Sequence, residues 1–198
     1  MSLADCRAVF AHQPAHQIAS QLQDATTDLC GCELFPMADT SPGPVADVEA
    51  LHLIVSDPTD LDANGLLNPA SLIRIDTSGL SVLRENAGDV EFDHTITELK
   101  ARSAAANKPR SFLGVCIFSA QTVRHQNGER LVGVYDTALP MKPHHADLVG
   151  PCLQKIQGLS NSQHEKAKRK RIKEIISLVG RCFDPARSFR NGTFLKHS

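Results

Sequence analysis

Apolar residues recur three or four positions apart in three parts of the chain, which is the spacing of one face of an α-helix. The clearest case begins with the capping-box sequence at 162–165 and stops at Gly180. The same spacing follows Pro14, which suits a first helical turn, and Gly88. The pattern therefore predicts three helices, near 14–24, 88–107 and 163–179.

Other apolar runs have the length and composition of β-strands. Leu51–Val55 is stopped by a Ser-Asp-Pro sequence, and Leu72–Ile75 has enough branched residues to be a second strand. Residues 112–118 (FLGVCIF) are almost continuously apolar, as in a strand that is buried on both faces. We expect this third strand in the middle of a sheet.

A hairpin is predicted at Asn127-Gly128, because both residues tolerate positive φ in a tight turn. Residues 130–135 then form its second strand. The segment before the turn allows two interpretations, a strand over 121–126 or a short helix over 119–124.

These elements predict an α+β fold, with a small, mostly antiparallel sheet and about three packed helices. The length of 198 residues fits one domain. Residues 162–198 are then a basic, helical C-terminal appendage to that domain, and the Pro- and Gly-rich segment 36–47 is a surface loop.

The apolar runs are far shorter than the ~20 residues of a membrane span. The first residues lack a basic segment followed by an apolar one, so the sequence predicts a cytoplasmic protein without a membrane anchor. In that reducing compartment, we expect the six cysteines to be free and mostly buried thiols.

The net charge of −1 conceals a strong asymmetry. The residues after Gln154 hold eleven Lys and Arg against three acidic residues, a balance of +8. Subtraction from the totals of 21 and 22 leaves ten basic and nineteen acidic residues before that point, a balance of −9. This uneven distribution of charge along the chain favours either a binding surface for an anion or packing of the basic C-terminal part on the acidic remainder of the chain, here called the acidic body.

Most of this basic charge lies on the third predicted helix. Its cations could straddle phosphates, which would give salt-dependent binding to nucleic acid, although consecutive cations spread around a helix cannot all reach one flat surface. The alternatives are a solvated face, a protein partner, or pairing with the acidic body. The six residues are Lys166, Lys168, Arg169, Lys170, Arg171 and Lys173.

A second candidate site follows the predicted strand 130–135, where several titratable residues lie close together in a predicted loop. Imidazole and carboxylate groups can bind a divalent metal or transfer protons near neutral pH. The alternative is a structural role, with side-chain turns and an exposed histidine. The candidate catalytic residues are Asp136, His144, His145 and Asp147.

Arg84 is a further candidate, as an anion clamp close to Ser81, because a guanidinium can hold a phosphate through two parallel bonds. The alternative is a surface salt link to Glu85 or Glu91.

A zinc site is a further candidate, because four side chains are of the types that bind zinc. Their spacing along the chain is poor for such a site, so buried thiols and ordinary histidines are the better interpretation. The ligands of such a site would be His12, His16, Cys30 and Cys32.

The common phosphate-loop, dinucleotide, hydrolase-elbow and metalloprotease motifs do not occur in the sequence. Two hypotheses from different classes follow. The first is a nucleic-acid-associated binding module that uses the basic helix. The second is a small metal-assisted or acid/base enzyme that acts on an anionic, phosphate-containing substrate through the Asp136–Asp147 loop, with Arg84 as the anion clamp. The sequence does not identify a cofactor.

Overall fold

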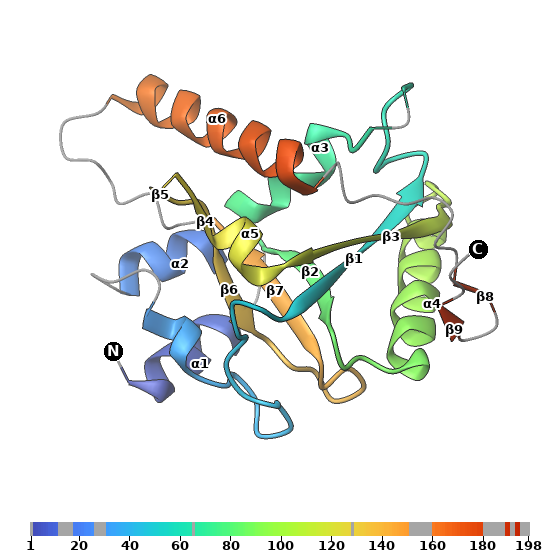
Figure 1. Ribbon diagram of the computed structural model, residues 1–198, viewed down its shortest axis with the longest axis horizontal. Helices are drawn as coiled ribbons and strands as arrows, with labels where there is room; N and C mark the ends of the chain where they lie inside the picture. Colours follow the sequence, from blue (N-terminus) through green and yellow to red (C-terminus); the bar gives the residue numbers. More distant parts are fainter. Residues whose placement is uncertain are drawn as a thin grey trace.

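A five-stranded antiparallel sheet with the order β3-β1-β2-β7-β6 organises the chain (Figure 1). The computed structural model describes residues 2–11, 18–25, 31–64, 66–127, 129–150, 160–179, 189–190 and 193–194. The predicted α+β class with an antiparallel sheet is confirmed. The strands of the sheet are β1 (Ala50–Asp57), β2 (Leu80–Arg84), β3 (Ser111–Ser119), β6 (Gly133–Asp136) and β7 (His145–Val149).

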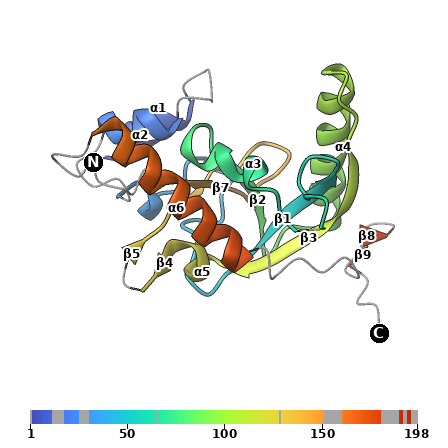
Figure 2. The same ribbon diagram turned by 90° about the horizontal axis from the view of Figure 1, so that it is seen from above.

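Helices cover both faces of the sheet (Figures 1 and 2). One face packs against α3 (Pro69–Leu72), α5 (Ala120–Arg124) and α6 (Asn161–Val179). The other face carries α1 (Leu3–Ala11), α2 (Ile18–Ala25) and α4 (Asp89–Ala105). Short 3-10 turns, η2 (Gly31–Leu34) and η3 (Ile73–Asp76), complete the packing.

The two faces of the sheet differ in how continuous their apolar surface is. On the α6 side, alternate residues of every strand join one large apolar cluster. On the α4 side there are two smaller clusters, one around Phe92 and one around Tyr135. Between them the positions of β2 and β7 that face this side include Ser81, His145 and Asp147, so a polar strip divides the apolar surface.

The strand predicted at Leu72–Ile75 is wrong, because these residues form the end of α3 and the turn η3. Asn68 caps the short helix by accepting a hydrogen bond from the Ala70 backbone N at 3.0 Å, and Pro69 occupies its first turn. These start signals outweigh the branched residues that follow. The actual strand is β2, eight residues further along.

The apolar strand predicted at 112–118 is confirmed as β3, but its expected position in the middle of the sheet is wrong, because β3 lies at an edge. Val115 packs under α4, whereas Cys116 and Phe118 join the cluster on the opposite face. A continuous apolar run therefore indicates that both faces of the strand are buried, but it does not indicate a central place in the strand order.

The predicted hairpin is confirmed as a two-residue ladder between β4 (His125–Gln126) and β5 (Glu129–Arg130). Asn127 at its turn has a φ of 52°. The short-helix alternative for 119–124 is realised as α5. The strand predicted at 130–135 is divided between β5 and β6.

The helices predicted over 88–107 and 163–179 are confirmed as α4 and α6. The cap of α6 lies two residues before the predicted one: Gln163 N donates to Ser160 Oγ at 3.4 Å, and Ser160 N donates to Gln163 Oε1 at 2.7 Å. The helix predicted near 14–24 corresponds to α2, and its first residues lie outside the described part of the chain. The helix α1 was not predicted.

Cys6 of α1 and Cys32 of η2 form a disulfide. The prediction of free thiols is therefore wrong for these two cysteines, while Cys116 is buried in β3 as expected. Near the C-terminus, β8 (Phe189–Arg190) pairs with β9 (Thr193–Phe194). None of the described helices has both the length and the apolar character needed to cross a membrane.

Candidate functional site

Arg84 and Asp136, two of the predicted site residues, belong to a buried network on the α6 side of the sheet. The Arg84 guanidinium holds Glu49 through two bonds, from Nε to Oε1 at 2.6 Å and from Nη2 to Oε2 at 2.8 Å. Its Nη1 donates to the Gly43 carbonyl oxygen at 2.6 Å and lies 3.3 Å from Asp136 Oδ2. The donors of Arg84 are thus engaged within the protein.

Asp136 is fully buried at the end of β6, where Ser41 Oγ donates to its Oδ2. Burial raises the pKa of Asp136 to about 6, although the nearby Arg84 acts in the opposite direction. The Arg84 guanidinium thus contacts two carboxylates, and most of its donors are occupied by Glu49. The network ties the 36–47 loop to the sheet.

His144 and His145 are neighbours in the sequence with different surroundings. His144 Nδ1 lies 2.6 Å from Glu91 Oε1, and the His144 backbone N donates to Glu91 Oε2 at 3.0 Å. Together with the Lys142–Glu98 ion pair at 2.7 Å, this fastens residues 137–144 to α4. Beyond this loop, His145 and Asp147 are in β7, so their predicted place in a loop is wrong.

A hydrogen-bonded chain runs across the polar strip of the sheet, from His145 through Thr137 and Asp147 to Ser81. Thr137 Oγ1 donates to Asp147 Oδ2 at 2.8 Å, and Ser81 Oγ donates to Asp147 Oδ1 at 3.1 Å. His145 Nδ1 lies 2.9 Å from Thr137 Oγ1 and 3.2 Å from the Thr137 carbonyl oxygen.

This chain determines which nitrogen of His145 carries the proton. The Thr137 carbonyl oxygen can only accept, and the Thr137 hydroxyl hydrogen is already given to Asp147. His145 Nδ1 must therefore be the donor to both oxygens, which leaves Nε2 of the neutral ring with a lone pair. In the described part of the chain, no hydrogen bond involves Nε2.

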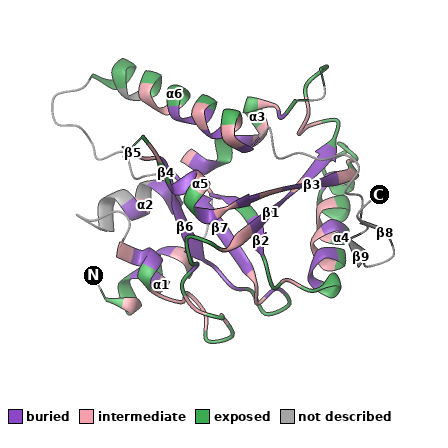
Figure 3. Cartoon of the chain, viewed as in Figure 1, coloured by how far each residue is buried: buried purple, intermediate pink, exposed green. Residues whose placement is uncertain are grey.

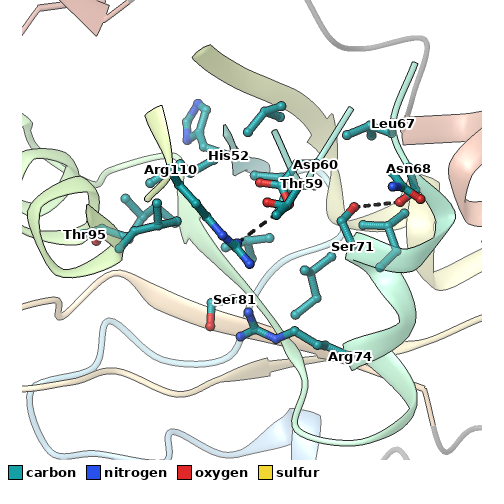
Figure 4. Close-up of a pocket in the computed structure, with 18 of the residues that line it drawn as sticks. His52, Thr59, Asp60, Leu67, Asn68, Ser71, Arg74, Ser81, Thr95 and Arg110 are labelled. Carbon is teal, nitrogen blue, oxygen red and sulfur yellow. Dashed lines mark hydrogen bonds and ion pairs between the residues drawn. The ribbon is translucent and has the colours of Figure 1, made fainter. Parts of the chain in front are cut away.

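The polar strip opens into a pocket of about 440 Å³, a volume within the range of ~300–1,000 Å³ that is usual for ligand sites (Figure 4). The pocket lies where the sheet separates. β1 and β2 pair at Leu51↔Arg84 and His52↔Leu83, and beyond these pairs consecutive residues of both strands line the pocket. Ser81 and His145 are among the lining residues, and His52 packs edge-on against Phe92 beside them.

Three arginines line this pocket: Arg74 from η3, Arg102 from the last turn of α4 and Arg110 from the residue before β3. Arg74 and Arg110 extend into the same space from different sides (Figure 4). Arg110 lies 4.0 Å from Asp60, whose carboxylate also accepts from Ser56. Within the described residues, Arg74 and Arg102 have no carboxylate within ion-pair distance.

Sequence reasoning did not find these arginines. They come from three elements far apart in the chain, and each has an ordinary local explanation. Arg102 is a cation in the last turn of a helix, where it interacts favourably with the helix dipole, and Arg110 follows a helix-ending proline. Arg74 lies in the segment that was wrongly predicted to be a strand. The one feature that points to them is spatial, namely their convergence on one pocket.

The predicted catalytic set is divided by the sheet. His145 and Asp147 lie on the pocket side, whereas Arg84 and Asp136 lie on the α6 side and His144 is bound to α4. Among the residues that the structure describes, no three His, Cys, Asp or Glu side chains converge as metal ligands would. Of the zinc candidates, Cys32 is in the disulfide, and His12, His16 and Cys30 lie outside the described residues.

The basic residues of α6 are also divided. Arg171 is buried and forms an ion pair with Asp76, whereas most of the others face outward. Burial raises the pKa of Asp76 and lowers the pKa of Arg171, and the attraction between the two groups opposes both changes.

Comparison of the chain with known protein families, with curated proteins and with solved structures finds no match. Its function is therefore inferred from its own residues.

Proposed function

We propose that this chain binds a small phosphorylated organic molecule in the pocket between β1, β2 and α4, with His145 as a proton acceptor for the bound ligand. The observation that carries this proposal is the convergence of three arginines on one pocket. The proposal develops the enzyme hypothesis, with a different anion-binding group from the predicted Arg84.

The charge of the pocket supports a phosphoryl group. Among the lining residues that the structure describes, three arginines face a single carboxylate, Asp60, which leaves a charge balance of +2 when histidine is neutral. A phosphate monoester carries a charge of about −1.5 to −2 at neutral pH and would neutralise this excess. A simple carboxylate would leave at least one arginine unpaired. The positive pocket is unusual for a region of the chain whose overall balance is −9.

The remaining lining supports an organic body on the ligand. Leucine side chains are prominent, with Thr59, Asn68 and Ser71 as hydrogen-bonding groups at one side. Ligand sites commonly have this composition, with apolar walls and a few convergent polar groups. A free phosphate ion would leave the apolar part of the pocket unfilled. The leucines of the lining are Leu53, Leu67, Leu72, Leu80, Leu83 and Leu99.

His145 would provide the chemistry. Its Nδ1 is held by Thr137, so Nε2 is the nitrogen available to a ligand. A neutral imidazole with an accessible Nε2 can accept a proton from a hydroxyl group within ~2.6–3.2 Å. Asp147 supports this orientation through the Thr137 hydroxyl, as the carboxylate beside a catalytic histidine often does.

The test is isothermal titration calorimetry with phenyl phosphate as the probe and benzoate as a probe of similar shape and lower charge. We expect phenyl phosphate to bind at least about tenfold more tightly, a difference of ~1.4 kcal/mol. Arg74→Gln and Arg110→Gln should each remove most of this preference. Arg7→Gln is the matched control, because Arg7 of α1 pairs with the exposed Asp39 and does not line the pocket.

Equal affinities for the two probes, or a phenyl phosphate affinity that Arg74→Gln and Arg110→Gln leave unchanged, would contradict the proposal. The proposal would also be contradicted if neither phenyl phosphate nor benzoate bound at millimolar concentration.

A further inference from the structure

The helix α6 has two sides of opposite character (Figure 3). Its inner side carries Ile172, Ile175 and Val179, which belong to the main apolar cluster, and the buried Arg171. Its outer side carries Lys166, Arg169, Lys170 and Lys173, and all four side chains are exposed. We call these four residues the basic stripe.

The spacing of the basic stripe places it on one side of the helix. Its members follow the i, i+3, i+4, i+7 pattern, and successive residues turn by about 100° in an α-helix. The four directions therefore fall within about 100° of one another, and Ile175 of the inner side points in nearly the opposite direction. The six cations of the helix do not all share one surface, as expected, because Lys168 and Arg171 depart from this pattern.

Pairing with the acidic body accounts for Arg171 but not for the basic stripe. Arg171 reaches Asp76 of η3, and Lys168 lies 3.2 Å from Glu165 of its own helix. Lys170 lies 3.6 Å from Glu174, one turn away. For Lys166, Arg169 and Lys173, the described part of the chain offers no carboxylate within ion-pair distance. Three of the four stripe residues are therefore available to an external anion, and the exposed Lys170 shares its charge with Glu174.

We propose that the basic stripe is a binding surface for the phosphate backbone of double-stranded nucleic acid. Its ends are seven residues apart, about 10 Å along a rigid helix. One strand of a duplex presents a phosphate every ~3.4 Å of its axis, so about three successive phosphates lie opposite the four cations. This regular charge on a rigid partner matches a rigid cationic helix.

The composition of α6 indicates backbone contact without base recognition. Residues 161–179 include no Phe, Tyr or Trp, so the helix offers no aromatic ring on which unpaired bases could stack. Lysine and arginine at the surface contact phosphates without regard to sequence. Binding should therefore depend on salt and on duplex length, and not on sequence. This surface is separate from the pocket, whose lining includes no residue of α6.

The experiment is fluorescence anisotropy with a labelled mixed-sequence duplex of about 20 base pairs over a salt series from ~50 to ~200 mM. If all four cations contact phosphates, the slope of log affinity against log salt should approach about −3.6, since each contact contributes about −0.9. Lys166→Gln combined with Lys170→Gln should reduce the size of this slope by about half and weaken binding at every salt concentration.

The matched control is Lys100→Gln combined with Lys108→Gln, which removes the same charge from exposed positions outside the stripe. This control should leave the slope unchanged. Arg74→Gln, which tests the pocket, should leave duplex binding unchanged too, so failure of one proposal is distinguishable from failure of the other.

Two results would overturn the proposal. The first is no duplex binding at ~50 mM salt, or binding that the stripe variant and its control affect equally. The second is competition by poly-L-glutamate as effective as that by unlabelled duplex at equal charge, which would indicate an acidic protein as the partner. Circular dichroism of the variants should match the wild-type spectrum, because the substituted side chains are exposed.

Discussion

Two groups of arginines in this molecule have opposite surroundings. Arg84, Arg124 and Arg171 are buried, and each faces at least one carboxylate, as when Arg124 Nε meets Glu33 Oε1 at 2.9 Å. Arg74, Arg102 and Arg110 line a pocket in which Asp60 is the one acidic side chain among the described lining residues. The first group joins loops and helices to the sheet. The side chains of the second group make no hydrogen bond with the residues that the structure describes, and we propose that their donors bind a ligand. An arginine is therefore a candidate for ligand binding when its donors lack protein acceptors.

The largest expected effect is the loss of a buried arginine. Arg84→Met would leave the buried Asp136 and the partly buried Glu49 without their cation, and the loss of one partner of a buried ion pair typically destabilises a protein by about 3–5 kcal/mol. Urea denaturation should show this loss as a lower midpoint at pH 7. A change below about 1 kcal/mol would mean that Arg84 does not hold this network together.

The next effect is a dependence on pH at Asp136. Its pKa rises from 3.8 to about 6 on folding, mainly through burial. Between these values the folded protein holds a proton that the unfolded chain releases, so this group's contribution to stability is present at low pH and is lost as pH rises toward 6. The loss amounts to about 3 kcal/mol.

Asp136→Asn should remove this dependence, because the amide resembles the protonated carboxyl. Relative to the wild type, the variant should gain roughly 2–3 kcal/mol of stability between about pH 4 and pH 7.5. Urea denaturation of both proteins at the two pH values measures this difference. A constant difference between them would contradict the account of the buried carboxyl.

A smaller effect is expected at the hydrogen-bonded chain of the pocket. Thr137→Val removes the hydroxyl between His145 and Asp147 and should cost about 1–3 kcal/mol, because a buried acceptor loses its donor. Nitrogen-15 NMR of the histidine ring should detect a proton on Nδ1 in the wild type and a mixture of tautomers in the variant. A wild-type ring with its proton on Nε2 would contradict the role proposed for His145.

The smallest effect on stability should come from the pocket arginines. Arg74→Gln changes an exposed side chain for which the described residues provide no carboxylate partner, so the free energy of unfolding should change by no more than about 0.5 kcal/mol. The same variant should lose most of the preference for phenyl phosphate over benzoate. A loss of stability comparable to that of Arg84→Met would remove the distinction between the two groups of arginines.

Much of the fold could be predicted from local patterns. The helices α4 and α6 and the strands β1 and β3 follow from apolar spacing, and the β4–β5 hairpin follows from its turn residues. The strand β2 was missed because Leu80–Arg84 is short and ends in charge, whereas the preceding branched residues resemble a strand more closely. Strand order was beyond local patterns, because the edge strand β3 is covered on both faces by helices.

The candidate site was predictable in part. The sequence singled out His145 and Asp147 in a predicted loop and Ser81 beside Arg84, and the structure joins the three residues through Thr137 and Asp147. It also singled out Arg84, whose donors are taken by Glu49 and Gly43. Whether an arginine meets a carboxylate or a cavity depends on contacts between distant segments, which residue types and spacing do not specify.

The most direct test of the pocket is a crystal structure of the protein with tungstate, a phosphate-like anion located by its anomalous signal. We expect tungstate among Arg74, Arg102 and Arg110, with the Arg110–Asp60 contact lengthened or replaced. Tungstate bound at α6 alone, with the three arginines turned away from the pocket or paired with protein groups, would contradict the assignment of this pocket as an anion site.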